Sequence, residues 1–311
     1  MRMKYTIKTV LIFFVFTLVG VKLCAQQQTQ YTQYMYTPSL INPAYVGLDG
    51  VMKLSLLHRE QWIGVKGAPV SQTLMLSIPL GQKMGIGFNI VQDQIGPAIE
   101  TNTSLDLSYG LQLNDAGLNL SFGMKGGVQL LNVDYTKLTT ENPNDNALNE
   151  NINSRITPNI GAGIYVYNND WYVGFSAPNL LSTKHYNRAS VSTVTSATHF
   201  YLTGGMNFNV NENTKFKPAF LIKSVTGAPT SIDFSLNFLF NNKFTSGFSY
   251  RYNASVSGLI DFKVNRSLSV GYAYDAPTSE IGYFSGGSHE VLLRYYFNRV
   301  RGHVRKPTWE F

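Results

Sequence analysis

The amino-acid sequence predicts an all-β fold, namely a transmembrane antiparallel β-barrel. Charged residues make up 14% of the 311-residue chain, against about 25% in ordinary soluble domains. The mean hydropathy is −0.08, as expected where only alternate residues of each strand face lipid. No apolar run after Val21 approaches the about 20 residues that a membrane-spanning helix needs. Strands, rather than helices, are therefore expected to cross the membrane.

The N-terminus predicts export through an inner membrane. Three cationic residues precede the apolar run 10–21, which is too short to span a bilayer and is followed by Leu23, Cys24 and Ala25. This order is typical of a signal peptide, and we expect residues 1–25 to be removed by cleavage after Ala25. Lipidation of Cys24 is the alternative, but Leu23 is not the small residue that such a site needs.

Removal of the signal peptide changes the charge and the cysteine count. Cys24 is the only cysteine, so the mature chain is expected to have no disulfide and no thiolate metal site. Loss of four cationic residues lowers the formal net charge from +7 to +3, and the tail 299–311 carries four cationic residues against Glu310. The rest of the chain is close to neutral. We therefore expect no nucleic-acid partner, no metal and no cofactor.

From residue 51 onward, runs of period-two alternation are separated by Gly, Asn, Asp or Pro, which is typical of strands joined by turns. The clearest pair of strands flanks Asn241 and Asn242, where a hairpin turn is expected. An even number of strands is usual for a closed barrel and leaves both termini in the periplasm. The fourteen expected strands are 51–60, 70–79, 84–93, 100–113, 117–132, 158–167, 170–177, 197–209, 214–224, 229–240, 243–253, 255–264, 267–275 and 288–298.

The charged residues distinguish a lipid-facing barrel from a soluble β-sandwich. Within the strands, charges fall on the face opposite the apolar residues, as Asp233 does relative to Ile232 and Phe234. That polar face is thinly charged and rich in Ser, Gly, Asn and Thr. A sandwich would carry a densely charged outer face, whereas a crowded barrel lumen suits this composition. Tyr and Phe near the strand ends predict interfacial aromatic girdles.

Three regions outside the expected barrel (51–298) receive separate predictions. The irregular segment 26–50 is expected either to plug the lumen or to lie in the periplasm as a contact arm, and Pro43 and Gly47 can simply shape a turn. The stretch 134–155 is expected to be an extracellular loop, as are 178–196 and 276–287. The carboxylates of the stretch 134–155, which are Glu141, Asp145 and Glu150, do not have the spacing of an EF-hand. The basic tail 299–311 is expected in the periplasm.

A series of different short motifs occurs along the chain from about residue 31 to 298. They are Gln33-Tyr34-Met35, Asn42-Pro43-Ala44-Tyr45-Val46-Gly47, Arg59-Glu60-Gln61-Trp62, Gly67-Ala68-Pro69, Gly85-Ile86-Gly87, Asp93-Gln94-Ile95-Gly96, Tyr172-Val173-Gly174-Phe175-Ser176, Gly271-Tyr272-Ala273-Tyr274-Asp275 and Gly287-Ser288-His289-Glu290. With these motifs the chain resembles the PorP/SprF family of type IX secretion system membrane proteins.

The resemblance implies an outer-membrane component needed to secrete, and to hold at the surface, proteins with a C-terminal sorting domain, including gliding adhesins in some members. The partners it implies are those secreted proteins, the periplasmic secretion ring, peptidoglycan-linked components and outer-membrane lipid. It implies no catalysis.

The polar residues within these motifs are the candidate site. They can bind a secreted domain or, as we favour, neutralise one another inside the lumen, because unpaired charges in a confined space are costly. The candidates for lumen or partner contact are Asn42, Pro43, Arg59, Trp62, Asp93, Asp275, His289 and Glu290.

Two other function classes remain as alternatives. A porin or hydrophobic-solute channel is compatible with fourteen strands. A membrane-bound hydrolase would need a base, but no histidine lies in a nucleophile motif such as Gly-x-Ser-x-Gly. The available histidines are His58, His185, His199, His289 and His303.

Overall fold

A computed structural model describes residues 29–137, 151–181, 198–226 and 228–297. The expected signal peptide and the tail 299–311 lie outside these residues. The strands are β1 (Lys53–Glu60), β2 (Val70–Leu80), β3 (Met84–Ile95), β4 (Ala98–Gln112), β5 (Asn119–Val133), β6 (Ile152–Tyr167), β7 (Trp171–Asn179), β8 (His199–Met206), β9 (Phe208–Asn211), β10 (Thr214–Val225), β11 (Ser231–Phe240), β12 (Phe244–Arg251), β13 (Ser255–Lys263), β14 (Leu268–Pro277) and β15 (Ser288–Tyr296).

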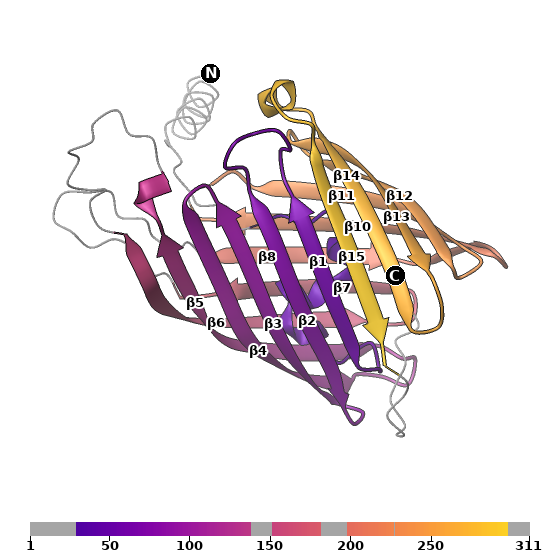
Figure 1. Cartoon of the computed structure of the whole chain (residues 1–311). Helices are drawn as coiled ribbons and strands as arrows, with labels where there is room; N and C mark the ends of the chain where they lie inside the picture. The colour runs from indigo at the N-terminus through magenta and orange to yellow at the C-terminus, as the bar shows by residue number, and fades with distance from the viewer. Residues whose placement is uncertain (1–28, 138–150, 182–197, 227, 298–311) are drawn as a thin grey trace, which may run out of the picture.

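The strands form one closed antiparallel barrel (Figure 1). Apart from β8 and β9, each strand pairs with its neighbour in sequence. The barrel closes where β15 pairs with β1 over the whole length of β1, from Lys53 opposite Tyr296 to Glu60 opposite His289. Both β8 and β9 pair with β10, so these two segments occupy one place in the barrel wall. The barrel therefore has fourteen strands, as the sequence predicts.

The faces of the strands have the polarity of a membrane barrel. On β11, Phe234 is 54% exposed on the outside, whereas its neighbour Asp233 is 2% exposed and faces the lumen. The same arrangement is found around the barrel: buried Arg, Lys, Asp and Glu line the inside, and Leu, Ile, Phe and Tyr cover the outside. This arrangement confirms the assignment made from charge placement.

Two strands differ from their expected extents by more than two residues or by a break. β6 begins at Ile152 rather than near residue 158, because a register shift against β5 and the positive φ of Ser154 interrupt the alternation there. The expected strand 197–209 is divided at Asn207 into β8 and β9. The turn at Asn241 and Asn242 is as expected, with φ of 50° and 51°, the left-handed values that tight hairpins use.

The connections differ in length at the two ends of the barrel. At one end, here called the long-loop end, lie the connections 61–69, 134–151, 180–198 and 278–287. At the other, the short-turn end, β2 joins β3 through residues 81–83 and β11 joins β12 through 241–243. β1 starts and β15 finishes at the short-turn end.

Residues 29–52, here called the N-terminal segment, lie inside the barrel (Figure 1). They form η1 (Tyr34–Tyr36), α2 (Pro38–Ile41) and η2 (Pro43–Tyr45); two further short helices, η3 (Tyr135–Lys137) and η5 (Glu280–Tyr283), lie in connections. Tyr34, Met35, Tyr36 and Ile41 form one hydrophobic cluster with lumen-facing Leu57, Met75, Leu259 and Leu292. The buried apolar core of this barrel is thus made by the N-terminal segment and the wall together.

Candidate functional site

Arg59, Asp275 and Glu290, here called the Arg59 cluster, meet in the lumen where β14, β15 and β1 run side by side. Nη2 of Arg59 lies 2.6 Å from Oδ2 of Asp275, and Nη1 lies 2.9 Å from Oε2 of Glu290. The three side chains are between 0% and 3% exposed. Arg59 and Glu290 are paired residues across the β1–β15 junction, so closure of the barrel brings them together.

The Arg59 cluster holds the N-terminal segment. The Glu290 carboxylate accepts hydrogen bonds from the backbone N–H groups of Thr32 and Gln33, each 2.9 Å long. The Thr32 hydroxyl donates to Asp275 over 2.6 Å. These bonds occupy the carboxylate lone pairs that the guanidinium leaves, which is what a buried ion pair needs to offset its desolvation cost. The charges of the wall and the backbone of the segment therefore form one network.

A second charged pair contacts the segment further along its path. Nη2 of Arg294 lies 2.6 Å from Oδ2 of Asp261, and the guanidinium of Arg294 lies over the Tyr36 ring at 4.5 Å from its centroid. An arginine in this position is attracted by the face of the ring. Asp233 with Arg251 and Asp106 with Lys125 form further lumen ion pairs, with atoms 2.6 Å and 3.1 Å apart.

Asn42 and Pro43 fix the later part of the segment. Oδ1 of Asn42 accepts from the backbone N–H of Ala44 over 2.9 Å and so caps η2, in which Pro43 is the first residue. Nδ2 of Asn42 donates to the carbonyl of Ile164 on β6 over 3.0 Å. Asn42 thus stabilises the turn and attaches it to the wall.

Glycines on the lumen face leave the space in which the segment lies. A Cβ on Gly163 would overlap Oδ1 of Asn42, and one on Gly123 would overlap the Pro43–Ala44 backbone. A Cβ on Gly85 would overlap the carbonyl oxygen of Val46, and one on Gly271 would overlap Oε1 of Gln33. Sequence reasoning missed this feature, although the alternation along each strand places these glycines on the face that points into the lumen. It also missed Thr32, Gln33 and Tyr36 as contacts.

Trp62, Asp93 and His289 do not join the Arg59 cluster. Trp62 lies in the β1–β2 connection with φ of 49°, and its backbone N–H donates to the Ser288 hydroxyl over 3.3 Å. His289 is on the outer face of β15, where its Nδ1 lies 2.6 Å from the Tyr272 hydroxyl. Asp93 faces the lumen near the long-loop end.

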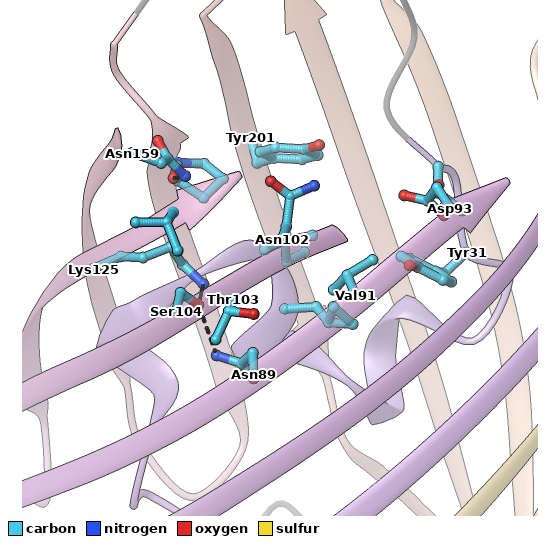
Figure 2. Close-up of a pocket in the computed structure, with 15 residues that line it drawn as sticks. Tyr31, Asn89, Val91, Asp93, Asn102, Thr103, Ser104, Lys125, Asn159 and Tyr201 are labelled. Carbon is cyan, nitrogen blue, oxygen red and sulfur yellow. Dashed lines mark hydrogen bonds between the residues drawn. The ribbon is translucent and has the colours of Figure 1, made fainter. Parts of the chain in front are cut away.

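Asp93 lines a cavity of about 100 Å³ between the N-terminal segment and the wall formed by β3 to β8. Figure 2 shows Tyr31 beside Asp93 on one side and Lys125 and Asn159 on the other. Lys125 donates to Ser104 over 3.3 Å as well as pairing with Asp106. One water molecule needs about 10–15 Å³ of such space, so the cavity can hold several waters or one small polar group.

The base of the connection 134–151 is held by Asp134. Its Oδ1 accepts from the Thr136 hydroxyl over 2.6 Å and from Nδ2 of Asn151 over 3.2 Å, which joins the two sides of the connection. Hydrogen bonding by Thr136 lowers the pKa of the Asp134 carboxyl below its ordinary value. The carboxylates Glu141, Asp145 and Glu150 lie outside the described residues.

The histidines weighed for catalysis lie apart in the structure. His58 is outside the barrel, with Nε2 3.1 Å from Oε1 of Glu60. His199 is 2% exposed in the lumen and stacks on Tyr201, whereas His185 and His303 lie outside the described residues. Among residues 29–137, 151–181, 198–226 and 228–297, no group of three His, Cys, Asp or Glu is placed to hold a metal ion. Within the same ranges no helix has the length and apolarity to cross a membrane.

The chain matches, over residues 23–295, the family described as "Type IX secretion system membrane protein PorP/SprF". The chain belongs to the PorP/SprF family. The family and the β-barrel with its apolar exterior place this PorP/SprF protein in the outer membrane, in association with the type IX secretion machinery.

Solved structures of outer-membrane barrels are similar to this PorP/SprF protein at low identity. The CymD monoaromatic hydrocarbon channel has 13% identity and a TM-score of 0.49, with 85% of this chain and 93% of that chain covered. The KdgM porin has 11% identity and a TM-score of 0.37, covering 79% and 99%. Omp33 of Acinetobacter baumannii has 8% identity and a TM-score of 0.42, covering 81% and 100%. A comparison with curated proteins gave no match.

Proposed function

We propose that this protein is a non-enzymatic component of the type IX secretion system, needed to secrete proteins with a C-terminal sorting domain or to hold them at the cell surface, gliding adhesins among them. The observation that carries the proposal is the family match over residues 23–295. In this role the barrel is a platform, and its loops and ends supply the contact surfaces.

The filled lumen favours the role of a platform rather than that of a porin or hydrophobic-solute channel. Residues 31–38 of the N-terminal segment are buried, and Arg59, Asp275 and Glu290 hold its first residues by charge-assisted hydrogen bonds. A passive channel needs a continuous path for solute. Purified protein in planar bilayers should therefore pass little current, and solute-dependent conductance without partners would favour the channel.

The lengths of the connections support an orientation. Outer-membrane barrels have short periplasmic turns and longer extracellular loops, so the short-turn end is assigned to the periplasm. Tyr296, where β15 finishes, is at that end, and the basic tail 299–311 follows it in sequence. The tail is the proposed contact with the periplasmic ring and peptidoglycan-linked components of the machinery.

Co-purification tests these partners. The full chain, a chain lacking residues 299–311, and a chain with its four tail cations changed to Gln should be purified from cells under matched expression. We expect ring components with the full chain, less with the Gln variant, and least with the truncation. Equal recovery with all three chains would exclude the tail as the contact.

Deletion of the gene tests the role itself. Loss of sorting-domain proteins from the cell surface, restored by the wild-type gene, is the expected result, and unchanged secretion would contradict the proposal. Catalysis is tested separately with lipid substrates in detergent: turnover that a His58→Ala or His199→Ala change abolishes would identify an enzyme instead.

A further inference from the structure

The N-terminal segment runs through the lumen in one direction, and β2 shows which. Along β2, from the long-loop end to the short-turn end, Ser71 contacts Thr29, Thr73 contacts Tyr31, and Ser77 contacts Gly47. The oxygens of Ser71 and Thr29 are 3.3 Å apart, those of Thr73 and Tyr31 are 3.1 Å apart, and the Gly47 N–H donates to Ser77 over 2.9 Å. The chain therefore enters at the long-loop end and leaves at the short-turn end.

Contacts on other strands give the same direction. Thr32 is bound by Glu290 and Asp275, which lie near the long-loop ends of β15 and β14. The Val46 carbonyl accepts from Ser108 near the short-turn end of β4, over 2.5 Å. Asp49 then pairs with Lys53, the first residue of β1, at 2.6 Å. Every part of the path is held by contacts with the wall.

The first and last described residues consequently lie at opposite ends of the barrel. Thr29 is at the long-loop end, whereas Phe297 follows β15 at the short-turn end, where its N–H donates to the Met52 carbonyl over 2.9 Å. The sequence-based expectation places both termini in the periplasm. With the expected cleavage after Ala25, only three residues precede Thr29, and each residue can extend the chain by at most about 3.6 Å.

We propose that the start of the mature chain is displayed on the same face as the long loops, and that the barrel closes around a segment already in place. The geometry of the closing strands supports the second part. Arg59 belongs to β1 and Glu290 to β15, and the backbone of Thr32 and Gln33 binds Glu290 beside this junction. The segment thus contributes to the contacts that join the first strand to the last.

This topology places the beginning of the mature protein on the same face of the barrel as the connections 61–69 and 278–287. A segment inserted from the short-turn end after closure would have to pass its whole length through a lumen lined by Arg294, Lys217 and other buried charged residues. Entry before closure avoids that passage. The inference concerns topology and does not depend on the proposed role in secretion.

Single-cysteine labelling tests the topology in intact cells. Cys24 is the only native cysteine, so the unmodified chain measures the background. Gln28→Cys, adjacent to Thr29, should be exposed to a membrane-impermeant maleimide together with Tyr283→Cys, whose parent residue is 89% exposed in the connection 278–287. Asn242→Cys in a short turn should react only after the outer membrane is permeabilised.

The outcomes separate the alternatives. Reaction of Gln28→Cys in intact cells, to the same extent as Tyr283→Cys, supports the proposal. Reaction only after permeabilisation, as for Asn242→Cys, would overturn it, and so would failure to react in any folded barrel. Labelling after denaturation confirms that each thiol is present, and migration in unheated gels confirms that each barrel is folded.

Fusion of a small, stably folded domain tests the path of the N-terminal segment. Placed between Ala25 and Gln26, it should block assembly, because it would have to reach the long-loop face before the barrel closes. Placed after Phe311, it should leave assembly intact. A correctly assembled barrel with the N-terminal fusion on the periplasmic side would contradict the proposed path.

Discussion

Arg59 and Glu290 face each other across the junction of the first and last strands, with Nη1 of Arg59 2.9 Å from Oε2 of Glu290. The same carboxylate binds two backbone N–H groups of the N-terminal segment. One residue therefore takes part both in closing the barrel and in filling it.

Glu290→Gln should destabilise the barrel, because it leaves the buried guanidinium of Arg59 with Asp275 alone and weakens two bonds to the segment. Removal of one partner from a buried pair costs about 3–5 kcal/mol. Because Asp275 still contacts Arg59, we expect a loss near the lower limit of this range. Unfolding by denaturant in lipid vesicles measures the change. Glu60→Gln is the control, since this side chain is 50% exposed outside the barrel and should lose less than about 1 kcal/mol. Equal losses would refute the role given to Glu290.

Gly163→Ala should displace Asn42, because the added Cβ would overlap its Oδ1. Forcing extra atoms into a packed interior costs about 1–3 kcal/mol. Gly258→Ala is the matched control, as nothing lies within 4 Å of the Cβ position there. Thermal unfolding should separate the two variants. If both behave as wild type, the segment is held less tightly at Asn42 than these contacts indicate.

Removal of residues 29–46 should open the lumen. The full chain fills this space with buried side chains such as Tyr34 and Tyr36, whereas the shortened chain leaves their volume to water. Stepwise conductance in planar bilayers should appear only after the deletion. Gel migration without heating checks that the shortened barrel is folded. A folded, shortened barrel that stays closed would show that other residues block the lumen.

Leu236→Arg should destabilise the membrane-inserted protein, because Leu236 is 50% exposed near the middle of β11 on the outer face. Arginine near the bilayer midplane on a lipid-facing strand costs about 2–4 kcal/mol. Tyr283→Arg introduces the same charge in a connection, where little change is expected. Folding yield into lipid vesicles compares them. Equal yields would mean that this part of β11 does not face lipid.

The sequence by itself determined the strands and the direction in which each side chain points. Alternation is local, so Asp233 and Phe234 could be assigned to opposite faces without knowledge of any partner strand. The assignment was less accurate at Ser154 and Asn207, where a register shift and a break interrupt the period.

Only the tertiary structure decided what fills the lumen and in which direction the N-terminal segment runs. The sequence identified Arg59, Asp275 and Glu290 as candidates, but Arg59 and Glu290 are 231 positions apart, and their contact depends on the closure of β15 against β1. The segment has no period that could reveal its path. Its position depends on lumen-facing glycines and charged residues drawn from many strands, and such long-range packing leaves little trace in any one stretch of sequence.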